Sequence, residues 1–187
     1  MATPQTPEAV LRTYLRAKDE NRPHLTPRAF TDDAVLHVHL RTGSIAFPSV
    51  TRGCCRITEV LVTSFALSYE NVYTFCMARP AEGVERFSCD WLVVMTEKTN
   101  GALRVGCGSY DWGFDAARGG LAHRLVITVE QMLSLPATEQ RPVFDWVETL
   151  PYPWATPAQV VTAAPGIAAL APVLHYLQAR AGRVEPA

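Results

Sequence analysis

Four successive segments with the composition of β-strands constrain the fold of this chain most. Residues 71–78, 86–97, 102–114 and 121–133 are rich in Val, Phe, Tyr, Trp, Thr and Cys. Short connectors separate them, and one contains Asn100-Gly101, a dipeptide typical of tight hairpins. Strands that follow one another through short links pair as an antiparallel meander. Because several segments are long, and Gly106 and Gly108 inside the third allow a bulge or bend, we expect a strongly curved sheet.

Helical patterns precede this meander. Thr6 suits a helix N-cap and Pro7 suits the first helical position, which predicts a helix over 7–19. Its apolar stripe consists of Val10, Leu11, Tyr14 and Leu15. A short second helix is expected to end near Phe30. A strand is then predicted over 34–40, a loop over 41–50 and a helix over 53–67.

Prolines interrupt the C-terminal part of the chain and divide 140–172 into short pieces. Thr156 and Pro157 predict the start of a short helix over 157–163, and a last helix is predicted over 167–181. Trp146, Tyr152 and Trp154 are expected to hold this tail on the rest of the molecule. We therefore expect an α+β domain over 1–135 and a Pro-rich helical extension over 136–187.

Composition excludes several classes of protein. Hydrophobic residues make up 48% of the chain and charged residues 19%, which indicates a packed core. Because 17 Lys and Arg balance 18 Asp and Glu, we expect no nucleic-acid partner, and the lack of a long apolar run predicts no membrane span. The five cysteines lack the spacing of a zinc site, and the N-terminus lacks a signal peptide, so we expect a cytoplasmic protein without a metal. No GxGxxG, Walker or GxSxG motif occurs, and no cofactor is expected.

The order of these elements resembles the cone-shaped α+β fold of the nuclear-transport-factor-2-like superfamily, in its SnoaL-like and ketosteroid-isomerase-like branch. The residues that carry the resemblance are Ala9-Val10 and Tyr14 in the first helix, Phe30-Thr31-Asp32-Asp33-Ala34, Arg52-Gly53, and the strands to about residue 135. The resemblance implies a curved antiparallel sheet packed on the N-terminal helices. It also implies a homodimer, because members of this superfamily commonly pair through the sheet.

The resemblance to ketosteroid isomerases runs without a gap from Ala9 to Leu36. It places Tyr14 at the position of their oxyanion-hole tyrosine and Asp90 near their second oxyanion-hole group, a protonated aspartic acid. Their catalytic base falls on Val38, which cannot accept a proton. His37 and His39 flank that position and share one strand face, so either is a candidate base.

Other candidate residues lie in the meander. Asp111 is a second candidate base, reminiscent of the late-strand aspartate of the polyketide cyclases. The aromatic side chains expected to form a flat apolar lining are Phe65, Trp91, Tyr110 and Trp112. For each of these residues a structural role is the alternative: a core aromatic, a polar side chain on a solvent face, or a carboxylate paired with an arginine.

Two functions remain open from the sequence. The first is an isomerase, cyclase or dehydratase that acts on a small hydrophobic carbonyl compound by general acid–base catalysis. The second is a non-catalytic module for binding a small ligand or for dimerisation. The two are distinguished by whether the histidines and aspartates point into a shared cavity.

Overall fold

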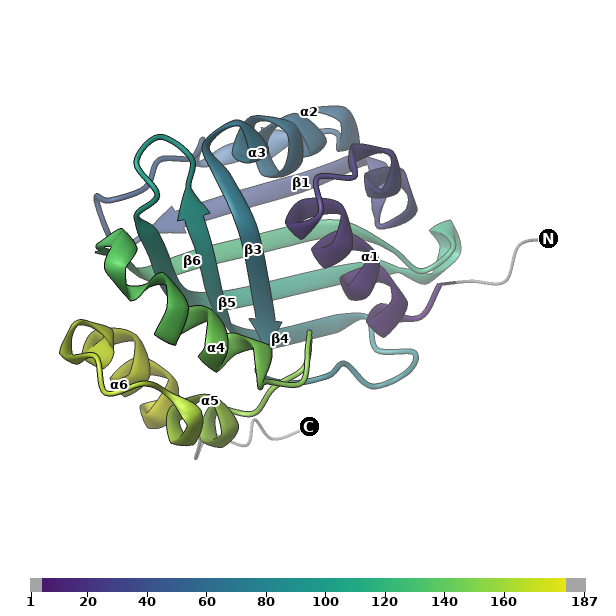
Figure 1. Ribbon diagram of the computed structural model, residues 1–187. Helices are drawn as coiled ribbons and strands as arrows, with labels where there is room; N and C mark the ends of the chain where they lie inside the picture. The colour runs from purple at the N-terminus through teal and green to yellow at the C-terminus, as the bar shows by residue number, and fades with distance from the viewer. Residues whose placement is uncertain (1–4, 181–187) are drawn as a thin grey trace.

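A curved, six-stranded sheet with helices on both faces forms the body of the protein in the computed structural model, which describes residues 5–180 (Figure 1). The strands are β1 (Phe30–Leu40), β2 (Val50–Arg52), β3 (Tyr69–Cys76), β4 (Arg86–Glu97), β5 (Leu103–Asp115) and β6 (Leu121–Leu135). Their order across the sheet is β2-β1-β6-β5-β4-β3. The antiparallel meander predicted from the sequence is confirmed for β3 to β6, whereas β1 lies parallel to β6. Over the described part of the chain, β2 and β3 are the two edges and the sheet stays open.

A one-residue bulge in β6 lies opposite Gly108 of β5, one of the two glycines singled out in the sequence. The register between β5 and β6 shifts between Cys107 and Gly108. A Cβ atom at Gly108 would lie 1.8 Å from the carbonyl oxygen of Thr128, so no other residue fits without moving the backbone. The bulge therefore depends on glycine.

The N-terminal helices cover one face of the sheet. Helix α1 (Pro7–Asp19) begins as predicted, and the Oγ1 of its N-cap Thr6 accepts a hydrogen bond of 3.2 Å from the amide of Ala9. The second predicted helix is a 3-10 helix, η1 (Pro23–Arg28). The third consists of α2 (Cys54–Thr58), a π-helical turn η2 (Glu59–Thr63) and α3 (Ser64–Ser68). Two boundaries in this region also differ from prediction: β1 begins four residues earlier, and the short β2 lies between the predicted loop and the predicted helix.

Alternation along the strands sorts their residues onto two faces. On β4, Trp91, Val93 and Met95 point to the face that packs on α1, which we call the inner face. Leu92 and Val94 point to the opposite, outer face. Each face carries its own buried apolar cluster, so the sheet is covered on both sides.

The C-terminal extension covers the outer face. After the 3-10 turn η3 (Ala116–Arg118) between β5 and β6, the later elements are η4 (Ala137–Glu139), α4 (Gln140–Glu148), α5 (Pro157–Ala163), η5 (Ala168–Leu170) and α6 (Ala171–Arg180). Helix α4 was not predicted, because Pro142 was read as a break although it lies in the first turn, where proline is tolerated. The indole of Trp146 joins α4 to α5 through a 3.1 Å hydrogen bond to the carbonyl of Val160. The last helix begins at Ala171, and residue 181 of the predicted range lies outside the described residues.

This cover bears on the expected homodimer. Phe75, Leu92 and Val94 are buried under the chain's own C-terminal helices, which lie away from α2 and α3 in Figure 1. That part of the sheet is therefore not free to contact a second chain. The homodimer stays a prediction, and its contact would have to use another surface. Between residues 5 and 180 no helix has the length and apolar character needed to span a membrane.

Candidate functional site

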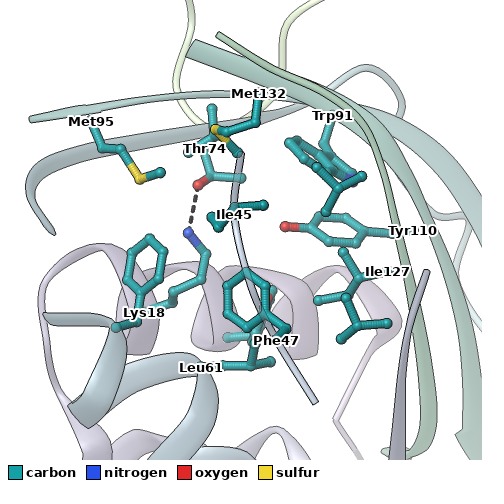
Figure 2. A pocket seen from close by; sticks show the side chains of 15 residues that line it. Lys18, Ile45, Phe47, Leu61, Thr74, Trp91, Met95, Tyr110, Ile127 and Met132 are labelled. Atoms are coloured by element: carbon teal, nitrogen blue, oxygen red, sulfur yellow. Dashed lines mark hydrogen bonds between the residues drawn. The ribbon is translucent and has the colours of Figure 1, made fainter. Parts of the chain in front are cut away.

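A cavity lies between the inner face of the sheet and the N-terminal helices (Figure 2). The space inside it that the centre of a water molecule can occupy is about 50 Å³. Its lining is mostly apolar and consists of Tyr14, Lys18, Val38, Ile45, Phe47, Leu61, Phe65, Thr74, Trp91, Val93, Met95, Tyr110, Ile127, Val129 and Met132. A ligand larger than a few waters requires flexible side chains such as Met95 or Met132 to move.

Two tyrosine hydroxyls belong to this cavity. Tyr14 on α1 and Tyr110 on β5 pack edge to face, with ring centroids 6.0 Å apart. Figure 2 shows the Tyr110 hydroxyl pointing into the cavity. The Tyr14 hydroxyl is buried and forms no hydrogen bond of normal geometry, although Tyr110 lies close enough to influence it electrostatically. Burial raises the pKa of both phenols, so both stay protonated and able to donate.

Among the lining residues that the structure describes, only Lys18, near the end of α1, carries a charge. The side chain is 7% exposed, and its Nζ donates to Asp19 Oδ1 at 2.5 Å and to Thr74 Oγ1 at 2.7 Å. It also lies 5.3 Å from the centre of the Phe65 ring, within range of a cation–π contact. Figure 2 shows the nitrogen reaching up from α1 towards Thr74.

Asp19 holds this lysine in place while staying out of the cavity lining. Its side chain is 2% exposed, and its oxygens accept hydrogen bonds from Lys18, from the amide and hydroxyl of Thr74, and from the hydroxyl of Tyr152. The desolvation of both charges is offset by their pairing and by these additional bonds. An ammonium has three protons, and Lys18 has two hydrogen-bonded partners, so one proton remains for a ligand.

Five of the predicted site residues lie at or behind the cavity. Tyr14, Phe65, Trp91 and Tyr110 line it. Trp112 is fully buried and contacts the Tyr14 ring at 5.2 Å, but it packs behind the lining on Phe30. The structure thus brings together the aromatic residues expected to bind a ligand, with Trp112 as a supporting core residue.

The two histidines do not join them. His37 and His39 alternate along β1 with Leu36 and Val38, which are buried on the inner face, and Val38 lines the cavity. His37 is half-buried and His39 is exposed, both on the outer side. They share a face as expected, and strand alternation places that face away from the cavity.

The two aspartates also point to the outer side of the sheet. Asp90 accepts a 2.9 Å hydrogen bond from Tyr176 and lies 3.4 Å from Arg180, both on α6. Asp111 lies 3.2 Å from Arg124 on β6. The structure therefore places both near arginine partners, which is the structural alternative considered for them. Nowhere in residues 5–180 do three or more His, Cys, Asp or Glu side chains gather closely enough to hold a metal ion.

The sequence did not predict the polar end of the cavity, which is formed by Lys18 and Thr74. Lys18 is absent from the apolar stripe predicted for α1, although it follows Leu11 by seven residues and Tyr14 by four, which puts it on the same face. Ile45 and Phe47 were assigned to a loop and nevertheless line the cavity. The helical spacing of Lys18 was the available signal, and nothing local distinguished Ile45 and Phe47.

Comparison with known proteins identifies the fold. No protein-family model matches the sequence, and no curated protein matches it. Among solved structures, a nuclear transport factor 2-like superfamily protein from Salmonella enterica is 17% identical with a TM-score of 0.54, over 66% of this chain and 88% of that one. The Δ5-3-ketosteroid isomerase from Mycobacterium sp. is 15% identical with a TM-score of 0.53, over 70% and 99%. A Mycobacterium tuberculosis protein in complex with estradiol-17β-hemisuccinate is 13% identical with a TM-score of 0.52, over 66% and 93%.

Proposed function

We propose that this chain, which has the nuclear-transport-factor-2-like fold, binds a small and mostly apolar molecule through one acceptor oxygen. The observation that carries the proposal is the Lys18 ammonium, buried at an apolar cavity with two of its three protons hydrogen-bonded. The tyrosine hydroxyls at the same cavity are further donors. A cavity lined by donors and apolar carbons favours a ligand that offers an acceptor on an apolar frame.

The net charge of the Lys18–Asp19 pair limits which kind of ligand oxygen the site can accept. Lys18 and Asp19 together are neutral, so a carboxylate ligand would add an uncompensated charge to an apolar site. A carbonyl oxygen accepts from the ammonium without adding net charge. We therefore assign the ligand to the small ketones, aldehydes or esters, which agrees with the hydrophobic carbonyl compound expected from the sequence.

A pair of isosteric probes tests this proposal. Cyclohexanone and methylenecyclohexane have the same shape and differ by an oxygen in place of a methylene group. A single charge-assisted hydrogen bond contributes about 1.5 kcal/mol or more, so we expect the ketone to bind about tenfold more tightly in an NMR titration. Lys18→Met should remove this preference.

The chain has two lysines, which supplies a matched control. Lys98 is exposed and donates to the carbonyl of Ala66, away from the cavity lining. Lys98→Met should keep the tenfold preference. Equal affinities of wild-type protein for the two probes, or a preference that survives Lys18→Met, would refute the proposal.

Catalysis is the second candidate, favoured by the donors that could stabilise an enolate oxygen. Among residues 5–180 no carboxylate or histidine lines the cavity to act as a base, because His37, His39, Asp90 and Asp111 lie elsewhere. Binding alone therefore predicts that the protein does not accelerate exchange of the α-protons of cyclohexanone in D2O. A measured acceleration that Lys18→Met abolishes would establish the catalytic alternative instead.

A further inference from the structure

The C-terminal extension reaches the polar end of the cavity through one side chain. Tyr152, in the segment after α4, donates from its hydroxyl to Asp19 Oδ2 at 2.9 Å. Its ring stands edge-on against Phe75 at 5.6 Å and Tyr73 at 6.1 Å, both on β3. The hydroxyl is therefore aimed by the packing of the ring, even though the residue is 45% exposed.

Backbone hydrogen bonds fix the segment that carries Tyr152. The amide of Cys76 at the end of β3 donates to the carbonyl of Pro153 at 2.8 Å, and the amide of Ala155 donates to the carbonyl of Cys76 at 3.1 Å. These bonds make Trp154 a parallel bridge partner of Cys76. The segment is thus attached to the strand that also carries Thr74.

Hydrogen bonds connect Tyr152 through Asp19 to Lys18, which lines the cavity. Asp19 Oδ2 accepts from both Tyr152 and the amide of Thr74, and these two bonds orient the carboxylate. Asp19 Oδ1 then accepts from Lys18 and from the hydroxyl of Thr74. The direction of the Lys18 ammonium is consequently determined by a carboxylate that Tyr152 helps to hold.

We propose that Tyr152 is a positioning residue for Lys18, and that the C-terminal segment is therefore part of the ligand-binding site. The effect on affinity rests on the function proposed above, whereas the effect on the position of Lys18 does not. Tyr152 itself is absent from the cavity lining, so it acts through Asp19.

The chain contains a matched control for this role. Tyr176 on α6 likewise donates to an aspartate, Asp90 of β4, at 2.9 Å. Both bonds join the extension to the rest of the molecule, but the bond to Asp90 lies on the outer face, away from the cavity. Tyr152→Phe and Tyr176→Phe each remove one hydroxyl and keep the ring.

The experiment measures ligand preference and the lysine itself in both variants. We expect Tyr152→Phe to lower the preference for cyclohexanone over methylenecyclohexane about threefold, without changing the affinity for the hydrocarbon. We expect Tyr176→Phe to change neither affinity. The Cε–Hε NMR signal of Lys18, one of two lysine signals in the spectrum and assigned by its loss in Lys18→Met, should shift in Tyr152→Phe alone.

The two readouts separate the possible failures. If the wild-type protein shows no preference for the ketone but the Lys18 signal shifts in Tyr152→Phe, the proposed function is wrong and the positioning role stands. If both probes weaken equally in Tyr152→Phe, the role of the hydroxyl is structural only. If the Lys18 signal is unchanged in Tyr152→Phe, or shifts as much in Tyr176→Phe, the positioning role is refuted.

Discussion

Replacing Lys18 by methionine tests whether the buried ion pair is formed in solution. The side chains of Lys18 and Asp19 are 7% and 2% exposed, and their charged atoms lie 2.5 Å apart. Removing one partner of a buried pair leaves the other charge uncompensated, which costs about 3–5 kcal/mol. Asp19 keeps its hydrogen bonds from Thr74 and Tyr152, so we expect the free energy of unfolding to fall by about 3 kcal/mol, the lower end of that range.

Urea unfolding followed by far-ultraviolet circular dichroism measures this loss, provided that the slope with denaturant is unchanged. Lys98→Met serves as the control, because an exposed lysine should change stability by no more than about 0.5 kcal/mol. Asp19→Asn and the double variant Lys18→Met/Asp19→Asn complete a double-mutant cycle. Because the double variant leaves no unpaired charge, we expect its loss of unfolding free energy to be smaller than the sum of the two single losses by at least about 1.5 kcal/mol.

Two outcomes would contradict this reasoning. A loss below about 0.5 kcal/mol in Lys18→Met would place the ammonium in water rather than at the cavity. Additive losses in the cycle would mean that Lys18 and Asp19 do not interact in solution, and the carbonyl-binding proposal would then lose its charged donor.

Two further predictions concern titratable groups. Burial raises the pKa of Tyr14 and Tyr110, so these phenols stay protonated in the folded protein, whereas in the unfolded chain they ionise near pH 10. Their contribution to the free energy of unfolding should therefore be fully present below about pH 10 and be lost progressively above it. Tyr14→Phe should reduce that alkaline loss and cost no more than about 0.5 kcal/mol at pH 7, since its hydroxyl forms no hydrogen bond of normal geometry with the described residues. Urea midpoints between pH 7 and 11 check both statements. Cys55 is exposed, whereas the other four cysteines are buried, and burial raises the pKa of Cys107 to about 12. A disulfide reagent at pH 8 should therefore label only one thiol rapidly. Cys55→Ser should abolish that fast phase, and a fast phase that survives would contradict the burial of the remaining thiols.

The elements of this fold were largely predictable because their signals are local. Composition and the Asn100-Gly101 turn predicted the meander, and Gly108 marked the position on β5 that faces the bulge of β6. Helix α4 escaped because a proline in the first helical turn looks the same in the sequence as a proline that ends a helix. Whether β1 pairs with β6 was not predictable, because that contact joins segments about ninety positions apart.

The candidate site was predictable only in part. Its aromatic lining followed from the strand pattern, but periodicity does not say which face of a strand is inside. His37 and Val38 exchange their roles with a shift of one residue, and only the packing of β1 on α1 decides between them. Lys18 lies outside the predicted apolar stripe. Its burial was not predictable because lysines are usually exposed and its partner Thr74 is 56 positions away.

The cover on the outer face of the sheet has a consequence for how this protein behaves on dilution. Two separate chains that hide apolar faces from water do so only above the concentration at which they associate. Here the covering helices are attached to the sheet at Leu135, so they meet it at an effective concentration set by the connection, on the order of millimolar or higher. Phe75, Leu92 and Val94 therefore stay covered at any protein concentration. Tyr152 belongs to the same C-terminal extension, so its hydrogen bond to Asp19 does not depend on protein concentration either.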